Sequence, residues 1–508
     1  MHTRYPPRAG SPHLRLASRH WPWPGLLTGL AVIAAAAAAA LLAGASLAAA
    51  QAAGARAASG GTWGTAKEVP GTATLNAGGS AAVWSVSCAS AGNCSAGGGY
   101  TDSSGHGQAL VVSQVGGTWG TAKEVPGTAA LNAGGSAGVG SVSCASAGNC
   151  SAGGSYTDSS GGFQALVVSQ VGGTWGTAKE VPGTATLNTG GFGVTYSVSC
   201  ASAVNCSAGG TYAPNHNSNL GQAFVVSKVN GTWRKAIEVP GTAALNTGRN
   251  AAVLSVSCAS AGNCSAGGTY FDSSGHVQAF VVSQVGGRWG TAEQVPGTAA
   301  LNTGGLARVW SVSCASAGNC SADGYYRDSS GFQTFVVSEV NGTWRKAIEV
   351  PGTAALNTGG GAGVPSVSCA SAGNCSATGE YADSSGHTQA FVVSQVGGIW
   401  GTAKEIPGTA ALNTGGKAAV GSVSCASAGN CSAGGRYADS SGHTQAFVVS
   451  QVGGIWGTAK EVPGTATLNT GGRAAVNSVS CASAGHCSAG GFYTGSSGHL
   501  QAFVVSQT

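Results

Sequence analysis

The chain has 508 residues, of which 87 are glycine, where only roughly 7% of residues are usually glycine. Charged residues make up 8% of the chain, where roughly 25% is usual. With 43% apolar residues, this composition excludes a charge-rich disordered chain, and glycine lacks the strict third-position repeat of collagen. The net charge of +5 comes mostly from arginines near the N-terminus, because from Gln51 onward 18 basic residues stand against 17 acidic ones. We therefore expect no nucleic-acid partner, which would require a clustered basic surface.

The first 50 residues have the pattern of a secretory signal. A basic, proline-rich start precedes an uncharged apolar stretch over residues 25–50, which ends in small residues that suit cleavage. We predict a signal peptide over residues 1–50, or an N-terminal membrane anchor, since about 25 apolar residues can span a bilayer. Residues 51–61 are predicted to be a short linker. The remainder is expected to be secreted or held at the cell surface, with no other membrane contact.

The cysteines follow one fixed spacing in eight C-x5-C pairs. An even number at a regular spacing in an exported chain predicts a disulfide within each pair. Zinc sites normally use shorter spacings with companion ligands, so we expect no metal there and no cofactor. The predicted pairs are Cys88/Cys94, Cys144/Cys150, Cys200/Cys206, Cys258/Cys264, Cys314/Cys320, Cys369/Cys375, Cys425/Cys431 and Cys481/Cys487.

One unit of about 56 residues occurs eight times, each copy marked by a tryptophan. In the first unit, strands are predicted over residues 83–88, 94–100, 108–115 and 118–125. Short turns rich in small residues join them, which predicts an antiparallel meander. The tryptophan opens the fourth strand, and we expect it to fill the wedge between neighbouring units rather than to stack on a sugar. The eight copies are Trp63, Trp119, Trp175, Trp233, Trp289, Trp344, Trp400 and Trp456.

A four-stranded meander repeated four to eight times indicates a β-propeller. A lone fourth-strand segment over residues 62–69 precedes the first unit, and the last unit stops after its third strand. We therefore predict an all-β, eight-bladed β-propeller over residues 62–508, with four-stranded antiparallel blades and the N-terminal strand completing the last blade. An open linear array is the alternative, but its terminal units would need polar caps. We expect a monomer.

The turn between the third and fourth strands carries a family resemblance. The segment S-Q-V-G-G-T-W over residues 113–119 and 169–175, with its variants at 227–233 and 338–344, resembles a degenerate Asp-box. Such boxes belong to BNR-type, sialidase-like propellers, and the V-S-C-A-S-A-G-N-C-S-A-G-G segment is similar to repeats of secreted bacterial proteins of that kind. The resemblance implies the fold, but propellers of this kind include hydrolases, lyases and binding scaffolds.

No catalytic residue is predicted. A sialidase-like site would need clustered arginines, a tyrosine with an acidic partner and an acid/base aspartate, whereas the arginines here come from different units. The recurrent D-S-S-G-H loop between the second and third strands could hold a metal in each blade. We expect instead that its aspartate initiates a turn and that its histidine is exposed. A carbohydrate-active enzyme, either a sialidase-like hydrolase or a lyase, and a structural cell-surface component remain alternatives.

The residues that differ between copies indicate a binding face. They fall in the loop entering each first strand and just before each S-V-S-C, so they should ring one mouth of the channel. Exposed aromatic and arginine side chains are common binding anchors, although unconstrained drift would also vary these positions. We predict a non-catalytic scaffold for a protein or carbohydrate ligand. The proposed ligand-binding residues are Trp84, Phe192, Tyr196, Arg249, Arg308, Trp310, Lys417 and Arg473.

Overall fold

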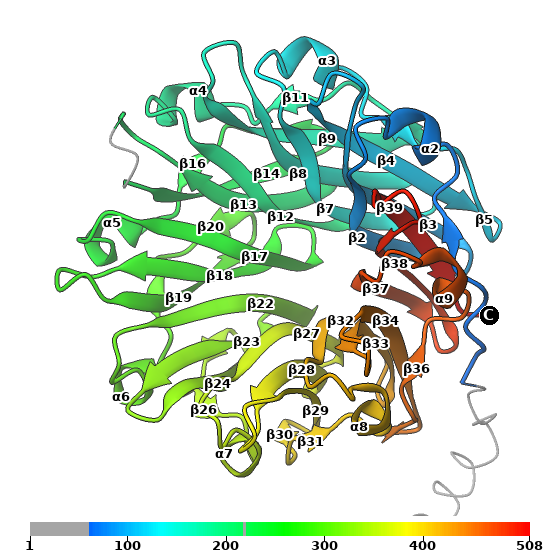
Figure 1. The fold of residues 1–508 in the computed structure, drawn as a ribbon. Helices are drawn as coiled ribbons and strands as arrows, with labels where there is room; N and C mark the ends of the chain where they lie inside the picture. Colours follow the sequence, from blue (N-terminus) through cyan, green and yellow to red (C-terminus); the bar gives the residue numbers. More distant parts are fainter. Residues whose placement is uncertain (1–59, 217–219) are drawn as a thin grey trace, which may run out of the picture. The chain divides into compact units, whose positions relative to one another are not determined.

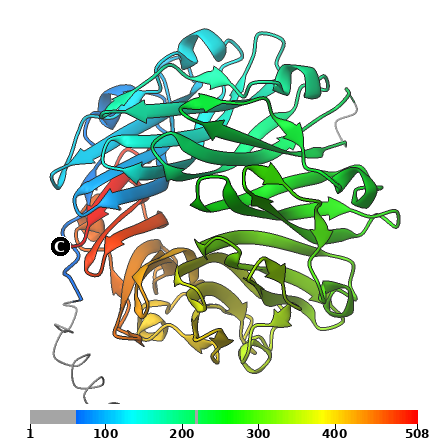
Figure 2. The same ribbon diagram turned by 180° about the vertical axis from the view of Figure 1, so that it is seen from behind.

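The computed structural model describes residues 60–216 and 220–508, so the predicted signal peptide and nearly all of the linker lie outside the described residues. Eight separate antiparallel sheets form blades around a common centre, and one edge strand of each sheet lies nearest that centre (Figure 1). The same ring is seen from behind in Figure 2. The predicted eight-bladed β-propeller is confirmed.

Each blade repeats the meander of the first. From the centre outward, that blade consists of β2 (Ala81–Ser90), β3 (Asn93–Thr101), β4 (Gly107–Val115) and the two short segments β5 (Thr118–Trp119) and β6 (Lys123–Glu124). A one-turn helix, α3 (Thr128–Leu131), then leads to the second blade. The helices lie at the periphery of the ring (Figure 1).

The other blades have closely similar bounds. The innermost strands are β7 (Ala137–Ser146), β12 (Gly193–Ser202), β17 (Ala251–Ser260), β22 (Ala307–Ser316), β27 (Gly363–Ser371), β32 (Ala419–Ser427) and β37 (Ala474–Ser483). The second strands are β8 (Asn149–Thr157), β13 (Asn205–Tyr212), β18 (Asn263–Phe271), β23 (Asn319–Asp328), β28 (Asn374–Ala382), β33 (Asn430–Ala438) and β38 (His486–Thr494). The third strands are β9 (Phe163–Val171), β14 (Gln222–Val229), β19 (Val277–Val285), β24 (Gly331–Val340), β29 (Thr388–Val396), β34 (Thr444–Val452) and β39 (Leu500–Ser506).

The outer strands and helices complete the list. The outer segments are β10 (Thr174–Trp175), β11 (Lys179–Glu180), β15 (Thr232–Trp233), β16 (Ile237–Glu238), β20 (Arg288–Trp289), β21 (Glu293–Gln294), β25 (Thr343–Trp344), β26 (Ile348–Glu349), β30 (Ile399–Trp400), β31 (Lys404–Glu405), β35 (Ile455–Trp456) and β36 (Lys460–Glu461). The one-turn helices are α2 (Thr72–Leu75), α4 (Thr184–Leu187), α5 (Thr242–Leu245), α6 (Thr298–Leu301), α7 (Thr353–Leu356), α8 (Thr409–Leu412) and α9 (Thr465–Leu468).

The fourth strand differs from the prediction of one continuous segment. β5 and β6 both pair with β4, but the chain between them leaves the ladder. There the backbone N–H of Ala122 donates to the carbonyl of Pro70, which follows the outer strand of the preceding blade, at 2.7 Å. Equivalent bonds recur at each blade junction, ending with Ala66 and Pro463. The outer strand is therefore broken because part of it links neighbouring blades.

The N-terminal segment closes the ring. β1 (Lys67–Glu68) pairs antiparallel with β39, giving the sheet order β1-β39-β38-β37. Further along the same pair of segments, Trp63 bridges to Gln507, and the backbone N–H of Thr62 donates to the carbonyl of Thr508 at 2.8 Å. The predicted closure, in which the first strand of the propeller completes the eighth blade, is confirmed.

The serines of the S-V-S-C motif connect the innermost strands. An innermost strand has one free edge, whose N–H groups need partners. In the second blade the N–H of Val142 donates to Ser85 Oγ at 3.0 Å, and that of Cys144 donates to Ser87 Oγ at 2.9 Å. The same two bonds recur at every junction, including the one between the eighth and first blades. The motif therefore needs serine for its hydroxyl as well as for its size.

The core is divided into eight clusters, each lying between adjacent blades. Every cluster contacts one of the repeated tryptophans, as predicted for wedge residues. The closing junction is built like the others, because fully buried Val69 and Val504 of the last blade pack with Val83 of the first. Trp119 also donates a hydrogen bond from Nε1 to Ser506 Oγ at 3.4 Å across that junction.

All sixteen cysteines form the eight predicted disulfides. In each blade the two cysteines are direct partners on the first and second strands, as Cys88 and Cys94 are in the first. Such bridges indicate an oxidising environment. No helix within the described residues is long and apolar enough to cross a bilayer.

The two cysteines of each bridge differ in burial, which the C-x5-C spacing did not predict. The first is partly buried and packs against the core cluster at its junction. The second is buried, and its sulfur faces a serine of the preceding blade; Cys150 Sγ, for example, lies 3.5 Å from Ser95 Oγ. The cysteines therefore form part of the packing at the blade junctions. The buried members are Cys94, Cys150, Cys206, Cys264, Cys320, Cys375, Cys431 and Cys487.

The interface between the fifth and sixth blades contains a buried acid. The second strand carries glycine opposite the first serine of S-V-S-C in most blades, because a Cβ at Gly97 would lie 2.4 Å from Val139 Cγ1 of the next blade. The fifth blade has Asp323 at this position, fully buried, and neither carboxylate oxygen has a hydrogen-bond partner in the described structure. Desolvation raises the pKa of Asp323 well above its ordinary value; the nearby backbone N–H of Ser311 acts to lower it, although its geometry falls outside that of a hydrogen bond.

Candidate functional site

Each innermost strand contains a β-bulge at the residue before S-V-S-C. In the first blade Val83 pairs with Gly98 and Ser85 pairs with Gly97, which leaves Trp84 without a partner in the ladder. A bulged residue carries no pairing requirement and can direct its side chain away from the sheet. The irregularity recurs in all eight blades, at Trp84, Gly140, Tyr196, Leu254, Trp310, Pro365, Gly421 and Asn477. The bulge explains why this position varies, and why it tolerates proline.

The structure separates the predicted binding residues into two groups. Trp84, Tyr196 and Trp310 are bulge residues with 44%, 39% and 45% of their surface exposed, and Arg308 lies two residues before Trp310 on β22. The others lie in the loops between blades. Three of them bridge to the start of a third strand, in the pairs Phe192–Phe163, Lys417–Thr388 and Arg473–Thr444, and the carbonyl of Arg249 accepts a hydrogen bond from the Gly221 N–H. This second group lies beside the starts of the third strands, one or two residues before the innermost strands begin.

A cavity of about 340 Å³ lies against the innermost strands of blades five to eight. Its lining comes from the first half of the first strands and the last half of the second strands, the end at which the loops predicted to bind emerge. We call it the blade 5–8 cavity. The lining side chains that could contact a ligand through an aromatic ring or a polar group are Trp310, Tyr325, Glu380, Arg436 and Asn477. Pro365 and Gly421 also line the cavity. Trp310 is the predicted binding residue that the cavity contains.

Small bulge residues create this space. Pro365 and Gly421 occupy the bulges of the sixth and seventh blades, where the first and fifth blades have tryptophan. The opposite case is Trp84, whose ring fills the wedge between the first two blades. A Cβ added at Gly138 would lie 2.5 Å from Trp84 Cζ3, and one at Gly99 would lie 2.8 Å from Cη2. Trp84 therefore covers its own blade junction, whereas Trp310 forms a wall of an open one.

Aromatic rings form one wall of the blade 5–8 cavity. The ring centroids of Trp310 and Tyr325 are 6.5 Å apart, with the planes tilted by 40°. Behind them, Phe332 meets Tyr325 edge to face at 5.8 Å, and the guanidinium of Arg327 lies 5.8 Å from the centroid of Phe332. Contacts of this geometry stabilise aromatic clusters, so the wall is held in place by neighbouring rings.

Two opposite charges face the same cavity. Glu380 on β28 and Arg436 on β33 stand at equivalent positions of adjacent blades. Burial raises the pKa of Glu380, while the positive charge of Arg436 acts to lower it. In the described part of the chain, neither side chain has a hydrogen bond or an ion pair with another residue. Both groups are therefore available to a ligand.

Sequence reasoning missed Tyr325, Glu380 and Arg436, although the repeat contained a signal for them. They occupy position x of the motif S-A-G-G-x-Y. This position differs between the copies, as the bulge position also does. The eight residues at this position are Gly99, Ser155, Thr211, Thr269, Tyr325, Glu380, Arg436 and Phe492. The register places this strand position beside the bulge, so both varying positions contribute to one surface.

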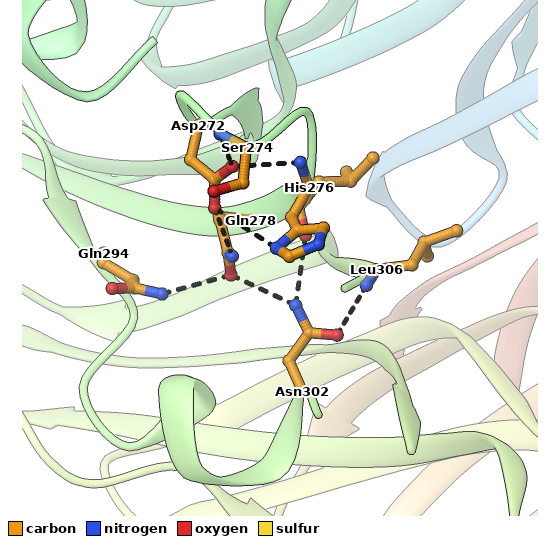
Figure 3. A network of polar contacts seen from close by, with 8 residues as sticks. Asp272, Ser274, His276, Gln278, Gln294, Asn302 and Leu306 are labelled. Carbon is orange, nitrogen blue, oxygen red and sulfur yellow. Dashed lines mark hydrogen bonds and ion pairs between the residues drawn. The ribbon is translucent and has the colours of Figure 1, made fainter. Parts of the chain in front are cut away.

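The D-S-S-G-H loop belongs to a structural network (Figure 3). In the fourth blade Asp272 Oδ1 accepts the backbone N–H of His276 at 3.0 Å, and Gln278 Nε2 donates to Asp272 Oδ2 at 2.9 Å. Asn302, which precedes the next blade, donates to Gln278 Oε1 at 3.1 Å and accepts the N–H of Leu306 at 2.6 Å. The aspartate thus initiates a turn and helps join two blades. No cluster of three or more His, Cys, Asp or Glu side chains suited to a metal occurs within residues 60–216 and 220–508.

Clefts also lie between blades at the disulfide end of the ring. One, of about 340 Å³, is lined by Asn374, Gln395 and residues around Cys375 and Cys431. A neighbouring cleft of about 220 Å³ has equivalent lining. Most of these residues recur in the other blades, and most have structural partners; Gln395, for example, donates to Ser338 Oγ across the junction. The blade 5–8 cavity is distinguished by side chains that differ from blade to blade.

Comparisons with known proteins add no functional assignment. No family model matches the chain and no curated protein matches it, so the resemblance to Asp-box repeats stays a prediction. The solved structures similar to it include Sqt1 from Chaetomium thermophilum (8% identity, TM-score 0.47, covering 87% of this chain and 97% of that one). They also include the β-propeller domain of the Trilobed protease from Pyrococcus furiosus (9%, 0.41, 73% and 97%) and a sialidase from Trypanosoma rangeli (10%, 0.34, 88% and 60%). At these identities and TM-scores, the similarities carry no argument about this chain's ligand or activity.

Proposed function

We propose that this protein is a secreted binding propeller that acts without catalysis and holds part of a protein or carbohydrate ligand in the blade 5–8 cavity. The single observation that carries this function is the concentration there of an aromatic wall, a carboxylate and a guanidinium that no structural bond requires. A preformed concave site with a few convergent polar groups is the usual form of a ligand site. The eight disulfides support the proposed export, because such bridges persist in oxidising compartments.

Turnover of a carbohydrate is the second candidate. Tyr325, Glu380 and Arg436 share the cavity, and a glutamate with a raised pKa is a possible general acid. Glu380 is, however, the one carboxylate among the described lining residues. Hydrolysis by paired carboxylates needs a second acid across the scissile bond. The geometry therefore favours binding.

The test is to fill the cavity with a side chain that the fold already accepts at the same position. Pro365→Trp places in the sixth blade the residue that the first and fifth blades carry at their bulges. Gly140→Trp is the matched control, because a Cβ there meets nothing within 4 Å and Gly140 does not line the cavity. Both variants and the natural protein would be applied to an oligosaccharide array and a displayed peptide library.

We expect Pro365→Trp to weaken the binding of the captured probe by at least about tenfold, and Gly140→Trp to leave it unchanged. Circular dichroism melting of both variants checks that they fold. Equal binding by Pro365→Trp and the natural protein would show that the ligand lies elsewhere. Release of a shortened saccharide by the natural protein, abolished by Glu380→Gln, would favour the enzyme.

A further inference from the structure

We infer that the ligand unit held by the blade 5–8 cavity is a neutral hexose-type sugar ring, stacked on Trp310 and hydrogen-bonded between Glu380 and Arg436. The inference rests on the proposed function and names the class of ligand for that site. It follows from the size of the cavity, its aromatic wall and its balance of charge, each of which excludes a different kind of ligand.

The size of the cavity limits the ligand to a small unit. Its volume of about 340 Å³ is near the lower end of the range of roughly 300–1,000 Å³ typical of small-molecule sites. Its lining includes the buried apolar side chains of Val364 and Val420 from the innermost strands. A folded protein domain would not enter, but one or two sugar rings at the end of a longer chain would fit such a space.

The aromatic wall suits a sugar ring. Trp310 keeps 45% of its surface exposed. A pyranose presents C–H groups on its faces and hydroxyls around its rim, so it can contact an aromatic face while its hydroxyls reach polar groups at the side. Tyr325 stands beside Trp310 with its hydroxyl free of any hydrogen bond to the described protein. An aliphatic ligand would gain from the ring but would leave these polar groups without partners.

The charge balance favours a neutral ligand. A carboxylate accepts hydrogen bonds and a guanidinium donates them, so Glu380 and Arg436 together satisfy neighbouring hydroxyls that each donate and accept. An anionic ligand would meet the charge of Glu380, and a cationic one would meet that of Arg436. Asn477 adds an acceptor at the far side, since its Nδ2 already donates to the carbonyl of Val83 at 2.8 Å and leaves Oδ1 free.

Titration calorimetry with defined saccharides tests the inference. The probes are neutral oligosaccharides of glucose, mannose, galactose and N-acetylglucosamine, a uronic-acid oligosaccharide and a glucosamine oligosaccharide. We expect at least one neutral probe to bind more tightly than both charged ones. Trp310→Ala should weaken that binding by about tenfold or more, and Glu380→Gln and Arg436→Gln by about fivefold each. Leu254→Ala, at a bulge that does not line the cavity, and Glu293→Gln, on an exposed outer strand, are matched controls expected to change nothing.

The outcomes separate this inference from the proposed function. Tighter binding of the uronic-acid probe, strengthened further by Glu380→Gln, would overturn the neutral class while leaving the cavity as the binding site. The absence of saccharide binding, together with a peptide whose binding Pro365→Trp abolishes, would also overturn the inference alone. A neutral saccharide that binds equally to the natural protein and to Pro365→Trp would overturn both.

Discussion

Removing the N-terminal strand should destabilise the propeller by roughly 5 kcal/mol or more. A chain that begins at Gly71 loses Trp63 from one blade junction and fully buried Val69 from the next. Deleting a fully buried tryptophan side chain costs about 3–5 kcal/mol, so the partly buried Trp63 contributes only part of that and Val69 adds to it. The deletion also frees the edge of β39 and leaves Tyr493 without its 2.9 Å hydrogen bond to Glu68. We expect a large loss because one short segment completes both the sheet and two parts of the core.

Urea unfolding of two chains, beginning at Gly60 and at Gly71, measures this effect. The Gly60 chain retains β1 and is the control for removal of everything before it. A synthetic peptide of residues 60–70 should restore part of the lost stability in a concentration-dependent way, because an extended peptide can add to an exposed sheet edge. Equal midpoints for the two chains would contradict closure by the first strand.

Replacing Asp323 by asparagine should stabilise the protein at pH 8 by about 2 kcal/mol or more, since an unpaired buried charge costs several kcal/mol. The carboxyl is fully buried, and neither oxygen has a partner in the described structure. Desolvation raises its pKa well above the ordinary value of 3.8. The protonated form is therefore the one that the folded protein prefers. Below about pH 3.8 the carboxyl is protonated in both the folded and the unfolded state, and Asp323 does not lower the free energy of unfolding through its charge. As the pH rises from there towards the raised pKa, that free energy of unfolding falls, because only the unfolded state loses its proton readily.

The measurement is the difference in unfolding free energy between Asp323→Asn and the natural protein from about pH 3.5 to pH 8. It should be smallest at acidic pH and should grow with pH until the buried carboxyl has titrated. Asp323→Thr, which copies the equivalent Thr378 of the sixth blade, should show the same trend. Glu293→Gln changes an exposed acid and should show none of it. An Asp323→Asn protein less stable than the natural one at pH 8 would show that the carboxylate has a favourable partner.

The repeat made most of the fold predictable. The spacing of Trp63 and its seven equivalents set the number of blades, and the leading segment of residues 62–69 predicted the closure. The C-x5-C spacing predicted the disulfides because it joins two adjacent strands in one hairpin. The same spacing did not show that the second cysteine of each pair is buried, since that depends on the neighbouring blade. The break in the outer strand was equally hidden, because it depends on a bond from Ala122 to Pro70 across a blade junction.

The candidate site was only partly predictable. Variation between copies identified Trp310, which lines the blade 5–8 cavity, but it also identified Lys417 and Arg473, which do not line it and lie by the third strands. Glu380 and Arg436 occupy a position that differs between the copies and lies within the second strand. In a single unit, a strand position of this kind indicates a structural role. Their common cavity exists because adjacent blades bring equivalent positions together and because small bulge residues leave the space open.

Hydrogen–deuterium exchange with and without a bound neutral oligosaccharide tests the central claim most directly, because the varying residues make the peptides of each blade distinguishable by mass. We expect slower exchange in residues 307–328, 363–382 and 419–438, which hold the aromatic wall, Glu380 and Arg436. Protection confined to the outer loops around residues 189–194, 414–418 and 470–474, or spread evenly over all eight blades, would contradict a ligand site in the blade 5–8 cavity.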